Sequence, residues 1–226
     1  MLPHELLGTA AVPGHRGELR LYRHDGDYTL RIDRHELMSS RVFGSEEVLA
    51  EAALQRLGPS PKPRVLLGGL GMGFTLARTL ALVPETAEVV VAELVPEVVR
   101  WNEQWLGDLT GRPLADARVR VVVGDVAAVL RAPGAGFDAI LLDVDNGPEG
   151  LTAAANDGLY AARGLGEAKA ALRPGGVLAV WSSAPDRAFS TRLRQAGFAV
   201  EEVRVKARRT RGPVRTIWVA QLPAGR

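Results

Sequence analysis

The chain has 226 residues, 46% of them hydrophobic and 24% charged, with a formal net charge of +2, which indicates a globular protein with a sizeable core. Its longest uncharged stretch, residues 65–77, is well short of the roughly 20 apolar residues that cross a bilayer, and residues 1–20 lack a secretory signal, so we expect a cytoplasmic protein. Cysteine is absent and the four histidines have no ligand spacing, which excludes disulfides and a cysteine nucleophile and leads us to expect no metal site.

The first predicted elements are two short strands and a helix. Residues 19–32 alternate between apolar and polar side chains on either side of a His-Asp-Gly-Asp turn, which predicts a small antiparallel β-hairpin. A helix follows, with Ser45 as its expected N-cap, two glutamates in its first turn and apolar residues at helical spacing up to Leu57. Gly58 and the proline after it end this helix.

From residue 64 onward, short apolar runs alternate with helical segments, a pattern typical of a parallel sheet covered by helices. Strands are expected at residues 65–67, 89–92, 119–123, 139–142 and 177–181, followed by an antiparallel hairpin with strands near 203–205 and 216–220. We therefore predict a Rossmann-like α/β fold: a mostly parallel seven-stranded sheet with helices on both faces. The expected division is a small N-terminal region, residues 1–58, and a cofactor-binding catalytic domain, residues 64–226.

Three glycines, Gly69, Gly71 and Gly73, lie where the first buried strand turns into a helix. Backbone amides at such a turn can approach a ligand closely, and the helix N-terminus favours a carboxylate or phosphate. Phe74 stands where the dinucleotide fingerprint needs its third glycine, which argues against NAD, and the absence of a following Lys-Ser/Thr pair disfavours a phosphate loop. A tight strand-to-helix turn without a ligand is the alternative.

The next three strands each end in a carboxylate. Glu93 can accept hydrogen bonds from both hydroxyls of a ribose, Asp125 with the adjacent Val126 can meet the amine of an adenine, and Asp143 ends the fourth strand. Any one of them could simply end a strand or cap a helix. Together they form a constellation, because ligands of open parallel sheets bind at the carboxyl ends of the strands.

The order of these segments resembles the spermidine synthase (aminopropyltransferase) branch of the class I S-adenosylmethionine-dependent methyltransferase superfamily. The similarity runs from about residue 18 to residue 220 and includes the segment FDAILLDVDNGP at 137–148. The resemblance implies a class I methyltransferase fold, S-adenosylmethionine or its decarboxylated form as cofactor, a small amine as acceptor, and a homodimer or homotetramer. It also implies that Asp143, the first acid of the family's Asp-x-x-Asp-Pro motif, accepts the proton of the attacking amine.

Three departures from the family pattern affect the expected substrates. The second acid of that motif is replaced by Asn146, which with Asp145 is expected to shape the acceptor pocket, and the family's Tyr-His-Glu is replaced by Ser-Glu-Glu at residues 45–47. Gly71 stands where the family has an aspartate that meets the aminopropyl end of the decarboxylated donor. Without that aspartate, the loop amides can receive the carboxylate of intact S-adenosylmethionine.

Three functions remain open. Gly71 favours methyl transfer from S-adenosylmethionine to a small amine-like acceptor, whereas the overall architecture and Asp143 favour a polyamine aminopropyltransferase. The third is a nucleic-acid-binding protein, either an RNA modifier or a cofactor-binding module without catalysis, that uses the six basic residues between positions 204 and 215. It ranks last, because the net charge is near neutral and the cluster lacks aromatic residues for base stacking. Tyr160 and Trp181 are candidate apolar walls of the acceptor pocket, with ordinary core packing as the alternative.

Overall fold

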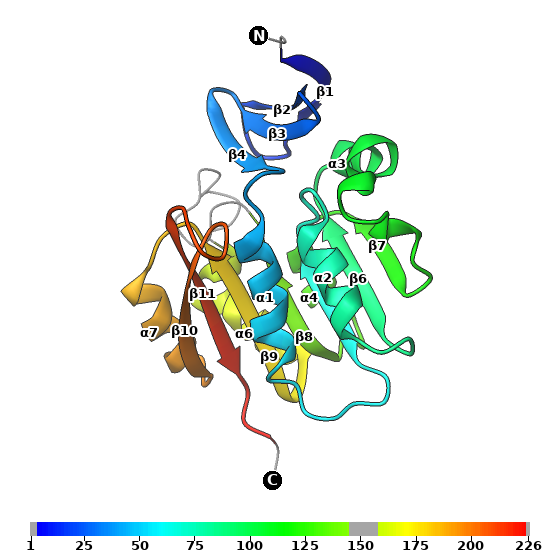
Figure 1. The fold of residues 1–226 in the computed structure, drawn as a ribbon. Helices are drawn as coiled ribbons and strands as arrows, with labels where there is room; N and C mark the ends of the chain where they lie inside the picture. Colours follow the sequence, from blue (N-terminus) through cyan, green and yellow to red (C-terminus); the bar gives the residue numbers. More distant parts are fainter. Residues whose placement is uncertain (1–3, 145–157, 225–226) are drawn as a thin grey trace.

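The computed structural model describes residues 4–144 and 158–224, which form two β-sheets (Figure 1). The antiparallel N-terminal sheet has the strand order β1-β2-β3-β4, with β1 (Glu5–Ala11), β2 (Glu18–His24), β3 (Asp27–Ile32) and β4 (His35–Ser39). The predicted hairpin is confirmed as β2 and β3, joined by a two-residue turn in which Asp25 and Gly26 have φ of 50° and 80°. The strands β1 and β4 extend this hairpin on both sides.

The second sheet has seven strands in the order β10-β11-β9-β8-β5-β6-β7. They are β5 (Arg64–Gly68), β6 (Glu88–Glu93), β7 (Val119–Val123), β8 (Phe137–Leu142), β9 (Leu172–Ser182), β10 (Ala199–Lys206) and β11 (Val214–Gln221). Five strands pair in parallel, and β10 and β11 form an antiparallel hairpin at one edge. This arrangement confirms the predicted Rossmann-like fold, and it places the six basic residues in the turn of that hairpin and on the strands beside it.

Helices cover both faces of the seven-stranded sheet. One face carries α1 (Gly44–Leu54), α2 (Phe74–Leu82) and α3 (Pro96–Trp101), the last continued by η1 (Asn102–Leu106), η2 (Gly107–Leu109) and η3 (Pro113–Ala115); the other carries α4 (Val126–Leu130), α6 (Ala162–Ala171) and α7 (Arg187–Gln195). Alternate strand residues face opposite cores, so Val65 and Leu67 belong to the first core and Leu66 to the second. No helix in the described ranges is long and apolar enough to cross a membrane.

The helix α1 spans Gly44–Leu54, so it begins two residues earlier than a Ser45 cap predicts and ends before the expected Leu57, and Ser45 does not cap it. Phe43 precedes the first turn without a capping side chain, and the Ser45 hydroxyl donates instead to Oε2 of Glu46 at 2.9 Å. The helix packs on α2 and on the strands of the large sheet, which brings its first turn to the carboxyl edge. The division of the chain between residues 58 and 64 stays a prediction.

The N-terminal sheet lies over the carboxyl edge of the seven-stranded sheet (Figure 1). Its inner residues, among them Leu21 and Ile32, belong to the same buried core as α1 and α2. Gly8 of β1 rests on the indole of Trp101, so close that a Cβ there would come within 2.6 Å of the indole Nε1. A glycine is therefore needed where β1 meets α3.

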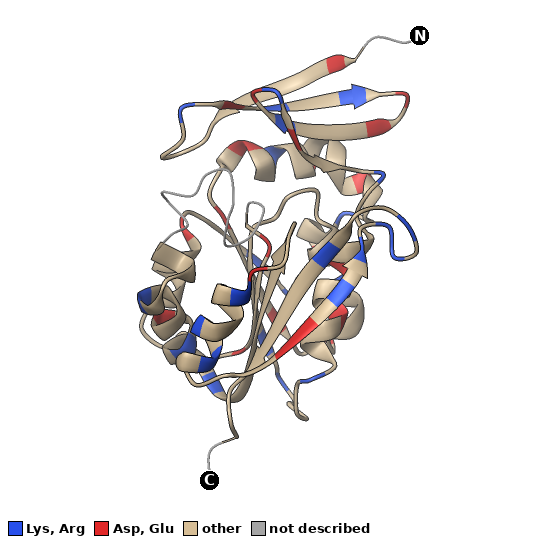
Figure 2. Cartoon of the chain, turned by 90° about the vertical axis from the view of Figure 1, so that its left-hand side faces the viewer, with Lys and Arg blue, Asp and Glu red and all other residues tan. Residues whose placement is uncertain are grey.

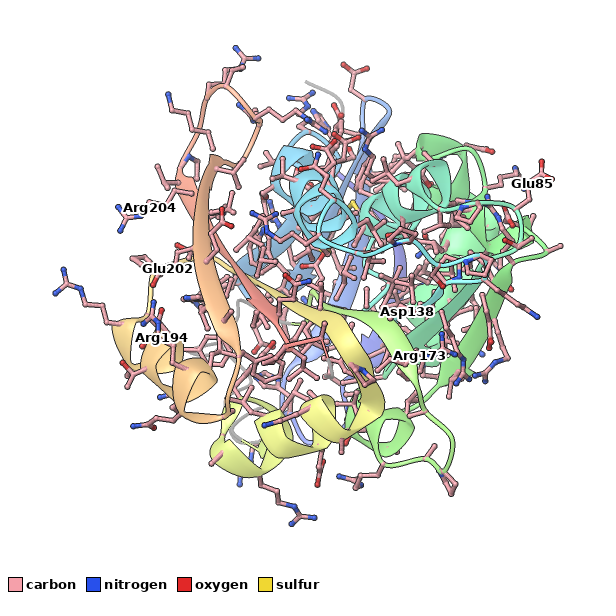
Figure 3. All side chains as sticks on the ribbon, turned by 90° about the horizontal axis from the view of Figure 1, so that it is seen from below. Glu85, Asp138, Arg173, Arg194, Glu202 and Arg204 are labelled. Carbon is pink, nitrogen blue, oxygen red and sulfur yellow. The ribbon has the colours of Figure 1, made fainter. Side chains whose placement is uncertain are left out.

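The opposite edge of the large sheet is fixed by an ion pair. Figure 3 shows Asp138 and Arg173 side by side in the view from below, and Arg173 donates to Asp138 at 2.7 Å. The same carboxylate oxygen accepts the backbone N–H of Arg64 at 2.7 Å. These bonds tie together the beginnings of β5, β8 and β9, away from the edge where the strands end.

Candidate active site

A cavity of about 450 Å³ lies between the carboxyl edge of the seven-stranded sheet and the N-terminal sheet. Its lining includes Gly71 of the glycine loop, Glu93 and Asp143 from strand ends, Glu46 of α1 and Arg215 of the terminal hairpin. Figure 2 shows Lys and Arg residues along this hairpin and in its turn, which lies close below the N-terminal sheet. A volume in the range of small-molecule sites, with converging acids, marks this cavity as the candidate active site.

The glycine loop follows β5 with three left-handed residues: Gly69, Gly71 and Gly73 have φ of 90°, 52° and 87°. A Cβ at Gly69 would lie 2.4 Å from the carbonyl oxygen of Asp143, and a Cβ at Gly71 would lie 2.7 Å from the methyl carbon of Met38. Gly69 and Gly71 line the cavity, whereas Gly73 is the N-cap of α2. The loop therefore exposes bare backbone to the cavity, and the N-terminal sheet covers it through Met38.

Asn102 holds this loop in place from the opposite side. It is the first residue of the π-helical turn η1, and its side-chain amide donates to the carbonyl oxygens of Gly71 at 2.8 Å and Val98 at 2.9 Å. Its Oδ1 is buried and has no hydrogen-bond partner in the described ranges. A π-helical turn at this point directs the amide toward the loop, as such turns often do beside functional sites.

Glu93, the predicted ribose ligand, is buried at the end of β6. Its two carboxylate oxygens accept the backbone N–H groups of Leu70 and Val95, both at 2.9 Å. Burial raises the pKa of this carboxyl, and the backbone hydrogen bonds oppose that rise. Each oxygen keeps a second lone pair, so the carboxylate can still accept from two neighbouring hydroxyls.

Asp125 and Val126 stand beside Glu93 at the end of β7 and also line the cavity. The Asp125 side chain caps α4, because its Oδ1 accepts the backbone N–H of Ala127 at 2.8 Å. Asp125 therefore caps a helix, which was the alternative to a ligand-binding role. Its second oxygen is the one left to meet a ligand.

Asp143 follows β8 directly below the glycine loop and is half-buried. Its backbone N–H donates to the Gly68 carbonyl at 2.9 Å, and its Oδ2 accepts the hydroxyl of Thr75 at 2.9 Å. Burial raises the pKa of Asp143 to about 6, against the opposing effect of the Thr75 hydrogen bond. A carboxyl with this pKa is suited to accepting a proton near neutral pH.

Glu46 is a cavity residue that the sequence analysis does not identify as part of the site. It lies in the first turn of α1, is only 7% exposed and lines the cavity. Burial, followed by the nearby Asp143 charge, raises the pKa of Glu46 to about 8. The signal was present in the sequence, because Glu46 precedes the buried Leu49 and Ala53 at helical spacing and so lies on the inward face.

The aromatic residues expected near the acceptor differ in role. Trp181 is 8% exposed and lines the cavity, and its indole Nε1 has no hydrogen-bond partner among the residues described. Tyr160 is buried and packs edge-to-face against Phe189 in the core of the other sheet face. Trp181 is thus a cavity wall, and Tyr160 is a core residue.

The structure brings together most of the predicted site. The residues that line one cavity are Gly69, Gly71, Glu93, Asp125, Val126 and Asp143. The two predicted acceptor residues, Asp145 and Asn146, lie outside the described residues.

A family model for the spermine/spermidine synthase domain matches residues 43–188, which include the glycine loop and all these acids. The chain belongs to the spermine/spermidine synthase family. The resemblance drawn from the sequence is therefore confirmed. The family match begins at Phe43, just before α1, and so leaves the N-terminal sheet outside it.

Among the relatives of known activity are two plant enzymes, putrescine N-methyltransferase 3 of Nicotiana tabacum and putrescine N-methyltransferase 1 of Nicotiana attenuata. Each is 36% identical to this chain over 123 residues. The match covers 53% of this chain but only 30% and 29% of the two relatives. The chain thus matches less than a third of the length of these enzymes.

Solved structures share the fold over nearly the whole chain. A spermidine synthase in complex with the transition-state analogue AdoDATO has a TM-score of 0.75 at 18% identity, covering 97% of this chain and 73% of its own. Spermidine synthase from Thermotoga maritima gives 0.76 at 17% identity with the same coverage. The O-methyltransferase TomG from Streptomyces achromogenes, in complex with SAM, gives 0.57 at 16% identity and 80% coverage of both chains. The fold is that of class I methyltransferases.

Proposed function

We propose that this protein is a transferase that moves a methyl group from S-adenosylmethionine to the nitrogen of a small amine. One observation carries the proposal: Gly71, where the aminopropyltransferase pattern has an aspartate, lines the same cavity as the acids Glu46 and Asp143. The loop is thus free of negative charge at the donor's tail, while the acceptor side is acidic. The Nicotiana relatives, which are methyltransferases for a diamine, support this reading.

The residues present fit an adenosyl-sulfonium donor. The backbone of Gly69 and Gly71 would hold the amino-acid end, Glu93 the ribose, and Asp125 with Val126 the adenine. The left-handed glycines leave no side chain between backbone and cavity. Backbone N–H groups hold both Glu93 oxygens, and each oxygen has a second lone pair for a ribose hydroxyl. Gly73 would contribute by starting α2, whose N-terminus favours a carboxylate.

The missing aspartate decides which donor the loop accepts. A carboxylate at position 71 would meet the carboxylate of intact S-adenosylmethionine, and two like charges at about 4 Å cost roughly 4 kcal/mol at an effective dielectric near 20. That corresponds to about a thousandfold in binding. With Gly71 this repulsion is absent, and the backbone amides of the loop are free to favour a carboxylate.

The chain's own residues would bind and deprotonate the amine. Glu46 and Asp143 attract the acceptor as an ammonium ion, and Asp143 takes its proton so that the nitrogen lone pair is free to attack. When bound, the donor supplies an electrophilic methyl carbon, and the bond from that carbon to sulfur breaks with its electron pair left on sulfur. Thr75 fixes the Asp143 carboxylate during this transfer. The cavity would align nucleophile and carbon, which is the largest contribution expected in such a displacement.

A second candidate is aminopropyl transfer from decarboxylated S-adenosylmethionine, as in spermidine synthases. It is favoured by Asp143, which matches the proton-accepting acid of that family, and by the family model itself. The same residues would serve both reactions, so the donor is what separates them. A homodimer or homotetramer, acceptor contacts from Asp145 and Asn146, and a cytoplasmic location without nucleic-acid binding belong to the same proposal.

The test is calorimetric titration with S-adenosylmethionine and its decarboxylated form, followed by mass analysis of products formed from a panel of small amines. We expect tighter binding of intact S-adenosylmethionine and products that gain a methyl group. Gly71→Asp should reverse the donor preference, with Gly71→Asn as the uncharged control of similar size. Preference of the wild-type protein for the decarboxylated donor, with aminopropylated products, would establish the second candidate instead.

A further inference from the structure

The acceptor end of the cavity carries charges of both signs. Glu46 and Asp143 line the cavity together with Arg208 and Arg215 of the terminal hairpin. Thr216, at the start of β11, pairs with Ser182 at the end of β9, so the neighbouring Arg215 lies at the carboxyl edge of the sheet. Because β11 runs antiparallel to β9, its first residues, including Arg215, lie at the edge where the parallel strands end in acids.

These two arginines are held by neutral partners and retain their charge for a ligand. The Arg215 guanidinium lies 5.5 Å from the centroid of the Trp181 ring and donates to the carbonyl oxygen of Ser183 at 3.3 Å. Arg208 donates to the carbonyl oxygen of Arg41 at 3.1 Å. Across residues 4–144 and 158–224, neither forms an ion pair with a carboxylate.

Their neighbour in the same turn shows the contrast. Arg209 has φ of 61° and forms ion pairs with Glu47 at 2.9 Å and Glu51 at 2.6 Å, both on α1. That double contact anchors the turn of the hairpin to the helix that carries Glu46. The anchoring charge is thus separate from the two charges that face the cavity.

A third polar group points to the same ligand chemistry. Trp181 is only 8% exposed. Its indole Nε1 is a hydrogen-bond donor without an acceptor in the described ranges. Buried donors normally have partners, so an unpaired one in a cavity wall indicates an acceptor atom on the ligand. The Arg215 charge is also close enough to oppose the rise that burial and Asp143 cause in the pKa of Glu46.

We infer that the acceptor is an amino-acid-like zwitterion, whose amine is held by Glu46 and Asp143 and whose carboxylate is held by Arg208 and Arg215. This inference rests on the proposed amine transfer and names its substrate class. A guanidinium and a carboxylate form charge-assisted hydrogen bonds, which are stronger than hydrogen bonds between neutral groups. The second ammonium of a diamine would instead face two guanidinium groups, and at about 5 Å and an effective dielectric near 20 one such contact weakens binding about a hundredfold.

The test compares ω-amino carboxylates with diamines of matched chain length: glycine, 4-aminobutanoate and 6-aminohexanoate beside ethylenediamine, 1,4-diaminobutane and 1,6-diaminohexane. Each is titrated calorimetrically into the full chain saturated with S-adenosylhomocysteine. We expect the best amino carboxylate to bind at least about tenfold more tightly than every diamine. Arg215→Gln and Arg208→Gln should each remove most of this preference.

Arg204→Gln is the matched control, because Arg204 lies on β10 of the same hairpin and points away from the molecule in Figure 3. It should leave the preference unchanged. A wild-type preference for diamines, or an unchanged preference in both Arg215→Gln and Arg208→Gln, would overturn the inference. Titration with S-adenosylhomocysteine alone separates the two proposals: absence of binding defeats the proposed function, whereas binding followed by a diamine preference defeats only the acceptor class.

Discussion

Asp143 and Glu46 are distant in sequence and line the same cavity. Asp143 is held by Thr75, whose hydroxyl favours the charged carboxylate, while Glu46 accepts a hydrogen bond from Ser45. Burial raises the pKa of both carboxyls, to about 6 for Asp143 and about 8 for Glu46. Near pH 7 the pair therefore carries close to one negative charge, and Asp143 is the member that can accept a proton.

The pH dependence of transfer tests this assignment. Because a protonated Asp143 cannot accept a proton, kcat/KM should rise with pH through about 6. Thr75→Val removes the hydrogen bond that lowers the pKa of Asp143, so the acidic limb of the profile should move to higher pH. Asp143→Asn should reduce the rate by about a hundredfold or more at every pH.

Thr79→Val is the control for Thr75→Val, because Thr79 is the next threonine of α2 and is likewise buried. Its pH profile should match that of the wild-type protein. A profile for Thr75→Val that does not move, or an Asp143→Asn variant that retains its rate, would contradict the role given to Asp143.

At the scale of elements, the glycine loop works together with β4 and η1. Met38 of β4 covers Gly71, and Asn102 of η1 binds the Gly71 carbonyl from the other side. The sequence predicts the loop itself, because three glycines between an apolar strand and a helix need left-handed backbone. It does not predict Met38 or Asn102, since neither belongs to the local pattern and their contacts arise only when distant elements pack.

A second prediction concerns this contact. Gly71→Ala puts a Cβ within 2.7 Å of the Met38 methyl carbon and a non-glycine residue at φ of 52°, so donor binding should weaken by about tenfold. Met38→Ala in the same chain removes the clash but not the backbone strain, and should restore part of the affinity. Calorimetric titration with S-adenosylhomocysteine measures all four combinations.

Gly26→Ala is the matched control, because Gly26 also has positive φ, at 80°, but a Cβ there meets nothing within 4 Å. It should leave donor affinity unchanged while carrying the same kind of strain. If Met38→Ala restores no affinity to Gly71→Ala, the contact with Met38 does not limit the side chain that position 71 tolerates.

At the scale of the whole molecule, the seven-stranded sheet and the acids at its edge follow from the sequence. Short apolar strands alternating with helices specify the sheet, and topology then requires that Glu93, Asp125 and Asp143 meet at one edge. The remainder of the site comes from the pieces added to this sheet. Glu46 and Arg215 lie on α1 and on the terminal hairpin, whose docking depends on long-range contacts such as those of Arg209 and not on local pattern.

The acids at the carboxyl edge of the sheet should make the stability of the protein depend on pH. In the folded chain the pKa of Glu46 is raised from 4.5 to about 8 and that of Asp143 from 3.8 to about 6, and burial raises that of Glu93 in the same direction. The folded state thus holds protons that the unfolded state releases. Stability from these groups is fully present below about pH 4 and is lost as pH rises toward 8. Asp116 has the opposite effect, because its pKa is lowered to about 2 in the folded chain. Its contribution to stability is present above about pH 4 and is lost as pH falls toward 2.

The Tm of the ligand-free protein should therefore fall between pH 5 and pH 8. Glu46→Gln keeps the shape of the side chain but needs no proton, so it should flatten this fall and raise Tm at pH 8 by about 4 °C or more. Glu47→Gln, one residue along α1, alters a carboxylate that already pairs with Arg209 and should leave the slope unchanged. Scanning calorimetry of the three proteins across this pH range is the measurement. A wild-type Tm that stays level or rises would mean that the pKa of Glu46 is not raised in the folded protein. Glu46 would then not lie in a low-dielectric environment.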